Sequence, residues 1–305
     1  MKDVPGLTGL RGAFALYVLF YHFATFGYAI RLPYLGELQL AGWSGVDGFF
    51  VLSGYLLFSL YRRPSVAYFV RRVFRTFPLY YASLPLYVAT GLMSATPVAL
   101  VYAQEYFPST FANVPLWTLA VEEAFYFVVF PLFLLAKPGT GKFLTVALAI
   151  SAAYSLLVPW TDFWTKQLPD YLVCYGFGMY FAEHGRASMK LASVGGLVFL
   201  FSVLVYRGGA DWPLQSAFFG FAYGAAIVCL QGSRALTNRV ALLFGRISYG
   251  LYVLQLPLMT ALGPPAGAAV AVLVAVPSYF LLERRFIDFG RSLFLPKAPT
   301  TLGEV

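Results

Sequence analysis

Two polar residues, Arg11 and His22, interrupt an apolar run near the start of the chain. The run spans residues 10–22 and reads LRGAFALYVLFYH. Eleven residues at about 100° each return almost to the same face of a helix and rise ~16 Å along it. An imidazole is the usual general base near neutral pH, and a guanidinium binds anions. The spacing therefore predicts an anion-binding group and a base on one helix face, with an ordinary interhelical hydrogen bond as the alternative for His22.

Carboxylates occur in two further apolar runs. Asp47 lies in GWSGVDGFFVLSGYLLF, and Glu122 lies in PLWTLAVEEAFYFVVFPLF. If both runs enter a membrane from its outer side, both carboxylates reach the depth of His22. A carboxylate at that depth is costly unless it is paired or faces a cavity. We therefore predict a catalytic group of His22, Asp47 and Glu122, in which a carboxylate orients the imidazole as general base. The alternatives are a helix cap for Asp47 and a purely structural role for Glu122.

A basic patch follows the run that contains Asp47. Arg72 and Arg75 lie three residues apart in FVRRVFRTFPLYY, so they share one helix face. The remaining arginines of the patch are Arg62, Arg63 and Arg71. Planar guanidinium groups bind phosphate through two hydrogen bonds at once. The patch predicts recognition of a phosphorylated ligand from the cytoplasm, and the alternative is ordinary positive charge or contact with anionic lipids beside a membrane.

Four other polar or aromatic residues are predicted to support a passage beside this cluster. They are Ser53, Tyr126, Trp117 and Gln255. Small residues such as Ser53 also let helices pack closely in membranes, which is the alternative for the FFVLSG segment.

The composition of the chain predicts which kind of secondary structure positions these residues. Of 305 residues, 60% are hydrophobic and only 11% are charged, whereas soluble domains carry about 25% charged residues. The chain is therefore predicted to be an all-α, polytopic membrane helix bundle. The net charge of +8 does not indicate nucleic-acid binding, because the interleaved aromatic residues suit lipid and core. Both cysteines sit in apolar runs, so no metal site is predicted.

Ten segments approach the ~20 apolar residues that cross a bilayer. They lie near 8–27, 43–60, 73–93, 116–136, 143–159, 169–183, 190–206, 212–230, 246–262 and 266–283. The links are short, so we predict a single transmembrane domain over residues 1–290 and a short cytoplasmic tail over 291–305. With a cytoplasmic N-terminus, 18 of the 21 basic residues fall on the cytoplasmic side. This bias follows the positive-inside rule and predicts a multi-pass protein of the cell membrane with both termini cytoplasmic.

Six motifs in a fixed order carry a resemblance to a known family. They are Arg11 and His22 with ten residues between them, Asp47 in GVDGFFVLSG, Arg72 and Arg75 followed by Pro78, Glu122 in WTLAVEEAFY, GRISYGLYVLQLPL, and LLERRFIDFG. Together they cover nearly the whole chain, and they resemble the type-3 membrane acyltransferases. These proteins transfer acetyl or other acyl groups to sugars, envelope polysaccharides, lipids and some secondary metabolites.

The resemblance implies a bundle of about ten helices in a membrane, which in bacteria is the inner membrane. It implies acyl-CoA, by default acetyl-CoA, as a donor that enters from the cytoplasm. It also implies a hydroxyl of a sugar, polysaccharide or lipid-linked molecule as the acceptor at the outer side. His22 matches the essential histidine, and Arg72, Arg75 and Glu122 match the paired arginines and the glutamate. Arg11 is expected below the pantetheine arm.

Departures from the family pattern occur at three positions. Thr118 stands where the family has serine and keeps the hydroxyl. Gln255 stands where histidine is frequent, and Arg285 where proline is frequent. Glutamine cannot titrate, so no proton relay is expected through Gln255.

Buried histidine and carboxylate groups also suit a transporter or exporter, and a non-catalytic scaffold is a further alternative. Within the enzyme reading, direct transfer and an acyl-histidine intermediate both stay open. The acceptor, the acyl length and the oligomeric state are not determined by the sequence.

Overall fold

In the computed structural model, residues 4–61, 63–103, 106–107, 109–110, 114–159, 161–206 and 214–294 are described. Within these ranges the chain is entirely helical, without a strand. The helices run in the order α1 Pro5–Thr25, α2 Leu35–Leu40, η1 Ala41–Ser44, α3 Gly45–Leu60, α4 Val66–Ala89, η2 Pro97–Val101, α5 Trp117–Ala124, η4 Phe125–Val129, α6 Phe130–Ala136, α7 Thr140–Leu157, η5 Trp164–Lys166, α8 Leu168–His184, α9 Met189–Tyr206, α10 Gln215–Leu230, α11 Arg234–Thr237, α12 Arg239–Leu262, α13 Pro264–Ser278, η6 Tyr279–Glu283 and α14 Arg284–Ser292.

Each of the ten predicted segments coincides with a helix or with a continuous helical run. Five runs in the described part of the chain are long and apolar enough to cross a membrane: Leu35–Leu60, Trp117–Ala136, Thr140–Leu157, Arg239–Leu262 and Pro264–Ser292. The all-helical prediction is thus confirmed, and these runs support a membrane protein. Crossing by all ten segments, the cytoplasmic termini and the division into a domain and a tail stay predictions. Arg62 of the basic patch and residues 295–305 of the predicted tail lie outside the described residues.

Two helices begin earlier than the hydropathy pattern predicts. α4 starts at Val66, where the Ser65 hydroxyl accepts a hydrogen bond from the Tyr68 amide at 3.2 Å. α12 starts at Arg239, where the Asn238 side chain accepts one from the Ala241 amide at 2.9 Å. Such caps satisfy backbone donors at the start of a helix, so each helix extends into its charged first turns. Arg72 and Arg75 therefore lie inside α4.

Small residues bring the central helices into close contact. A Cβ atom on Gly12 of α1 would meet the Gly245 nitrogen of α12 at 2.7 Å. Between α3 and α8, a Cβ on Gly54 would meet the Tyr175 oxygen at 2.4 Å, and one on Gly178 would meet the Val51 oxygen at 2.0 Å. Glycines at such points allow helix backbones to approach closely, as predicted for the FFVLSG segment.

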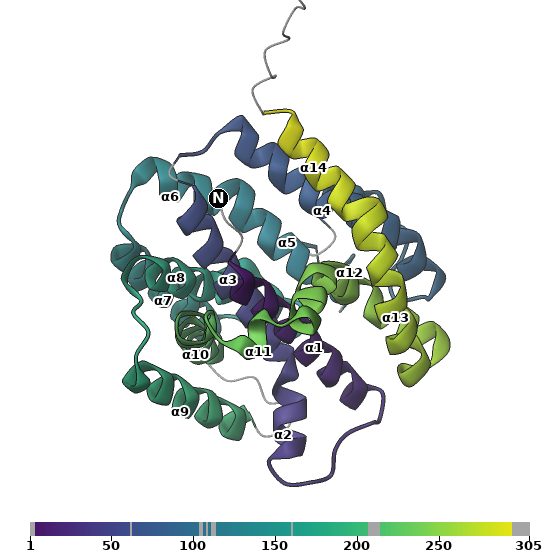
Figure 1. The fold of residues 1–305 in the computed structure, drawn as a ribbon, viewed down its shortest axis with the longest axis horizontal. Coiled ribbons are helices and arrows are strands. Elements are labelled where there is room, and N and C mark those ends of the chain that lie inside the picture. The colour runs from purple at the N-terminus through teal and green to yellow at the C-terminus, as the bar shows by residue number, and fades with distance from the viewer. Residues whose placement is uncertain are drawn as a thin grey trace, which may run out of the picture.

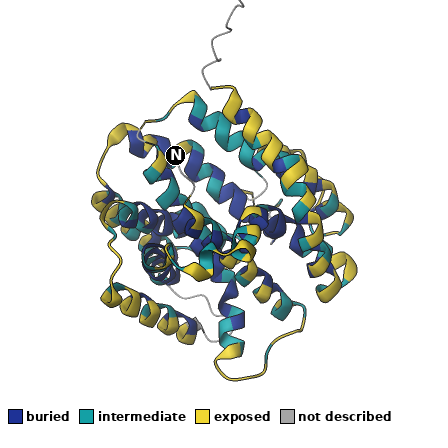
Figure 2. Ribbon diagram, viewed as in Figure 1, coloured by how far each residue is buried: buried dark blue, intermediate teal, exposed yellow. Residues whose placement is uncertain are grey.

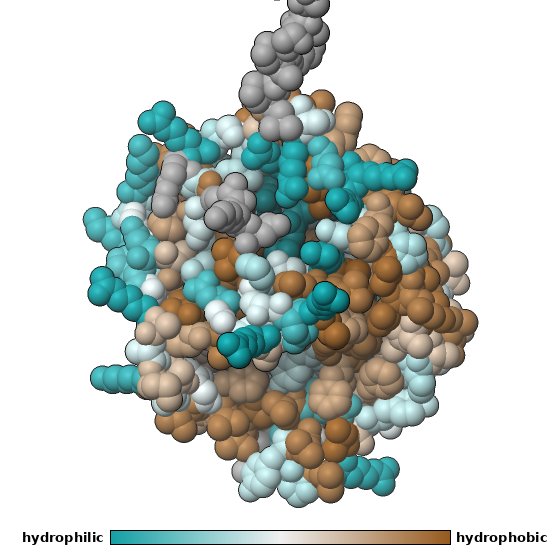
Figure 3. All heavy atoms as spheres, viewed as in Figure 1, coloured by the Kyte–Doolittle hydropathy of each residue, from teal (hydrophilic) through white to brown (hydrophobic). Residues whose placement is uncertain are grey.

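The arrangement is a bundle in which α1 and α3 lie near the centre (Figure 1). The amphipathic α14 runs beside α4, and its Phe289 ring packs edge-on against Phe74 at 5.2 Å. Exposed residues concentrate on the peripheral helices α9, α13 and α14, whereas the central helices are largely buried (Figure 2). Hydrophilic side chains gather around a hollow beside α14 (Figure 3).

Candidate active site

A cavity of about 530 Å³ lies between α1, α3, α4, α5, α12 and the last helical run. This volume lies within the range of sites that hold small molecules. The cavity reaches from Leu60 to Val46 along α3, which is fourteen residues or ~21 Å of helix. Its length suits an extended ligand.

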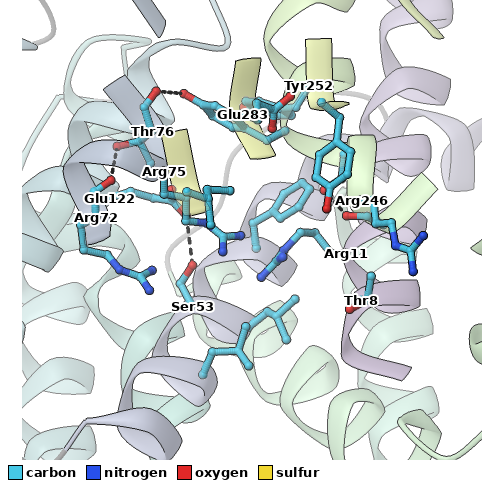
Figure 4. A pocket seen from close by; sticks show the side chains of 18 of the residues that line it. Thr8, Arg11, Ser53, Arg72, Arg75, Thr76, Glu122, Arg246, Tyr252 and Glu283 are labelled. Atoms are coloured by element: carbon cyan, nitrogen blue, oxygen red, sulfur yellow. Dashed lines mark hydrogen bonds between the residues drawn. The ribbon is translucent and has the colours of Figure 1, made fainter. Parts of the chain in front are cut away.

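The middle of the cavity carries an excess of positive charge. Arg11 from α1 and Arg72 and Arg75 from α4 line it together with Glu122 from α5. The side chains of Arg11 and Arg75 point toward one another across the cavity, and both act electrostatically on Glu122 (Figure 4). Within the described residues, none of these arginines comes within ion-pair distance of a carboxylate. Facing cations without ion pairs are suited to an anionic ligand.

Glu122 is held by a neighbouring hydroxyl. Ser53 of α3 donates a hydrogen bond to Glu122 Oε1 at 3.0 Å and is hydrogen-bonded to the Tyr126 hydroxyl at 2.8 Å. The Arg72 guanidinium lies over the Tyr126 ring at 5.5 Å and near the Tyr61 ring at 5.9 Å. These contacts fix the orientation of the carboxylate and of one arginine. The predicted residues Arg11, Ser53, Arg72, Arg75, Glu122 and Tyr126 thus meet in one cavity.

The cavity also contains Glu283, which the sequence analysis did not single out. It lies at the end of η6, is almost fully buried, and its charge acts on Arg75. A Cβ on Gly250 would meet its Oε1 atom at 3.0 Å. The LLERRFIDFG segment could have indicated it, because a glutamate that ends an apolar run needs a partner. Glu283 and Tyr126 both lie in single-turn π-helices, which are frequent at functional sites.

The exposed rim of the cavity is formed by charged residues. Arg284 and Arg291 of α14 contact Asp288 at 3.6 and 3.5 Å, and Arg246 of α12 also lines the cavity and is exposed. The guanidinium groups of the rim lie near solvent, whereas the guanidinium groups of Arg11, Arg72 and Arg75 line the interior of the cavity.

His22 lies apart from this cavity. It is 8% exposed, its Nδ1 atom is buried without a hydrogen-bond partner, and it is not among the described lining residues. No hydrogen bond or ion pair joins it to Asp47 or Glu122 within the described part of the chain. The predicted group of an imidazole and two carboxylates is therefore not brought together.

Gln255 of α12 lies in a similar environment. Its side chain is 0% exposed, and neither amide atom has a hydrogen-bond partner. α1 and α12 are in contact near Gly12 and Gly245, and both continue in the same direction from there. His22 and Gln255 each lie ten residues beyond this contact, so the register places them at a similar level.

Asp47 and Trp117 also lie outside the described lining. Asp47 is fully buried, and Cys174 Sγ of α8 donates to its Oδ1 at 3.5 Å. Trp117 packs against Phe50 and Tyr171, with ring centroids at 6.3 and 5.2 Å. The depth of Asp47 was predicted from its position along α3, but its direction around the helix differs from that of Ser53 by ~120°. Equal depth therefore did not bring Asp47 into the cavity.

Helical runs long and apolar enough to cross a membrane, together with an arginine-lined cavity, are features of a membrane protein with a site suited to an anionic ligand. Residues 4–282 match the model of the type-3 acyltransferase family, described as an acyltransferase domain. The chain belongs to this family and is an acyl-transferring enzyme.

A protein of Acidianus two-tailed virus is 28% identical over 314 residues, which cover 93% of this chain and 91% of the relative. Its name is "Putative acetyltransferase ORF330". No solved structure matches the chain significantly.

Proposed function

We propose that the protein is a membrane O-acyltransferase that uses cytoplasmic acyl-CoA as donor. The acceptor is a hydroxyl of a sugar, a polysaccharide or a lipid-linked molecule at the outer side of the membrane. The observation that carries this proposal is the cavity in which Arg11 and Arg75 face one another beside Arg72.

The charges of the cavity suit the phosphates of coenzyme A. Two facing guanidinium groups repel each other, and an anion between them removes that repulsion. The rim arginines Arg246, Arg284 and Arg291 offer further phosphate contacts. The cavity is ~21 Å deep along α3, which accommodates an extended pantetheine arm. The donor enters at the charged rim and directs its thioester toward Val46.

In this proposal His22 is the general base. It takes the proton of the acceptor hydroxyl, the oxygen forms a bond to the thioester carbonyl carbon, and the carbon–sulfur bond breaks. Coenzyme A leaves as the thiolate and is then protonated. Since Glu122 touches Ser53 and acts on Arg11 and Arg75, we assign it to holding the donor-binding arginines rather than to orienting His22.

The test uses purified protein in lipid nanodiscs with acetyl-CoA, following release of the CoA thiol. His22→Ala should lower turnover about 100-fold or more, as loss of a general base does, while CoA binding persists. Arg75→Ala should weaken CoA binding itself. Unchanged turnover in folded His22→Ala, or substrate movement that does not depend on CoA, would favour a scaffold or a transporter instead.

Two further measurements refine the proposal. Labelled acyl trapped on wild-type protein and absent from His22→Ala would replace direct transfer by an acyl-histidine intermediate. Mass spectrometry of envelope glycans from cells with and without the gene identifies the acceptor.

A further inference from the structure

The outer end of the cavity differs in character from its middle and its rim. Its lining there consists of Val46, Phe49, Phe50, Leu119 and Tyr252, with the Thr118 hydroxyl as an additional polar group. Except for Phe49, these residues are buried. The charged groups stop about one helical turn before this end. A ligand that spans the cavity therefore places an apolar group here.

Aromatic packing narrows this end of the cavity. The Phe49 ring meets Tyr252 at 5.7 Å and Phe14 at 5.9 Å, both edge-on. The Tyr252 hydroxyl accepts a hydrogen bond from Thr118 at 3.1 Å and donates to the Pro115 carbonyl at 3.3 Å. These contacts hold the Tyr252 ring across the cavity, where Figure 4 shows it.

The residues beyond this end are buried as well. Ser44 precedes α3 and Leu116 precedes α5, and both are fully buried. Of the described residues, neither His22 nor Gln255, which lie farther out along α1 and α12, lines the cavity. The apolar end is thus a narrow, buried part of the cavity that lies between the arginines and the level of His22.

We propose that Phe49 and Tyr252 determine the length of the acyl group that the enzyme transfers. This inference rests on the proposed acyl-CoA donor. An acetyl group fits between Phe49, Tyr252 and Val46, whereas each further methylene meets a ring held by neighbours on two sides. A hydrophobic pocket distinguishes ligands that differ by one methylene by about 10- to 200-fold. On this proposal the enzyme prefers a two-carbon acyl group to long chains.

The experiment compares release of CoA from acetyl-, butyryl- and octanoyl-CoA by the full-length protein in nanodiscs. Wild type should use acetyl-CoA at least about 100-fold faster than octanoyl-CoA. Phe49→Leu and Tyr252→Leu should each raise the ratio of butyryl to acetyl turnover about 10-fold. Tyr252→Phe keeps the ring and should keep the wild-type preference.

A matched control lies on the same helix. Phe58 of α3 packs against Phe133 at 6.0 Å and does not line the cavity, so Phe58→Leu makes the same chemical change elsewhere. It should leave the ratio unchanged. Val46→Leu fills the pocket instead, and it should lower acetyl-CoA turnover about 10-fold while the dissociation constant of unacylated CoA is unchanged.

The outcomes separate this inference from the proposed function. Wild-type protein that uses octanoyl-CoA as fast as acetyl-CoA, or folded Phe49→Leu and Tyr252→Leu that keep the wild-type ratio, overturns the length filter and leaves the acyltransferase intact. Wild-type protein that neither binds CoA nor releases it from any thioester overturns the donor assignment, and the filter with it. Val46→Leu adds volume without removing an aromatic ring. It therefore tests the pocket even if Phe49→Leu or Tyr252→Leu does not fold.

Discussion

At the scale of single residues, the hydroxyl of Ser53 links two parts of the cavity. It donates to Glu122 and contacts Tyr126, and this contact connects α3 to α5 and η4. A carboxylate oxygen that loses a buried donor pays a desolvation penalty of about 1–3 kcal/mol. The position of the arginines around Glu122 depends on this bond.

We expect Ser53→Ala to weaken CoA binding about 10-fold, because Glu122 then no longer holds a fixed position between Arg11 and Arg75. The measurement is a binding titration of CoA in nanodiscs. Ser59→Ala on the same helix is the control, since the Ser59 hydroxyl bonds the Tyr55 carbonyl at 2.7 Å and does not line the cavity among the described residues. Equal affinities of the two variants would contradict the assigned role of Ser53.

Gln255 allows a comparison of stability with activity. Its amide atoms lack partners, so Gln255→Met should leave the free energy of unfolding unchanged or raise it by about 1 kcal/mol. Transfer to the acceptor should nevertheless decline, because a buried amide retained without partners serves a ligand rather than the fold. Thermal unfolding and glycan labelling measure the two effects.

The control for this variant is Gln39→Met. The Gln39 amide accepts from the Ile30 amide at 2.7 Å and donates to the Phe20 and Tyr28 carbonyls at 3.2 and 3.1 Å. Its loss should destabilise the protein by about 2–3 kcal/mol. Destabilisation of Gln255→Met by a similar amount would instead assign Gln255 to the fold.

At the scale of helices, glycine contacts set how closely the elements approach. Gly178→Ala places a Cβ atom 2.0 Å from the Val51 oxygen, so α8 and α3 must separate. We expect a loss of about 1–3 kcal/mol in unfolding free energy. Gly196→Ala in α9 has no atom within 4 Å and should be neutral or slightly stabilising. Similar melting temperatures for the two variants would show that the α3–α8 contact tolerates separation.

The sequence predicted where the helices lie along the chain better than it predicted the direction in which each side chain faces around its helix. Runs of apolar residues located all ten helical segments, and helix spacing placed Arg72 and Arg75 on one face, which lines the cavity. Glu122 was grouped with His22 and Asp47, but it lines the cavity with these arginines. Membrane depth alone did not fix which neighbour a side chain faces, so Asp47 was grouped with His22 but contacts Cys174. Glu283 escaped notice because the guanidinium that acts on it, that of Arg75, comes from α4, far away in the chain.

At the scale of the whole molecule, the arginines of the cavity form two layers: an exposed layer at the rim and an enclosed layer in the middle. Rim residues such as Arg291 are exposed, and salt screens their effect within about 8 Å at physiological ionic strength. The inner arginines are enclosed, and salt affects them much less. The two layers thus contribute differently to attraction and to retention of a polyanionic donor.

We expect Arg291→Gln to weaken CoA binding by about 3-fold at low salt and to have no effect at high salt. Arg75→Gln should weaken binding at both. Titrations of CoA over a series of salt concentrations measure this difference. If both substitutions lost their effect in the same way on adding salt, the rim and the interior would not be separate layers.

The narrow aromatic end of the cavity also bears on the permeability of the membrane. A water-filled path from one side of a membrane to the other would conduct protons and dissipate the electrochemical gradient. The edge-on rings of Phe14, Phe49 and Tyr252 narrow the cavity beside Thr118. If the protein transfers acyl groups across the bilayer as proposed, this constriction would limit the leak of water and protons.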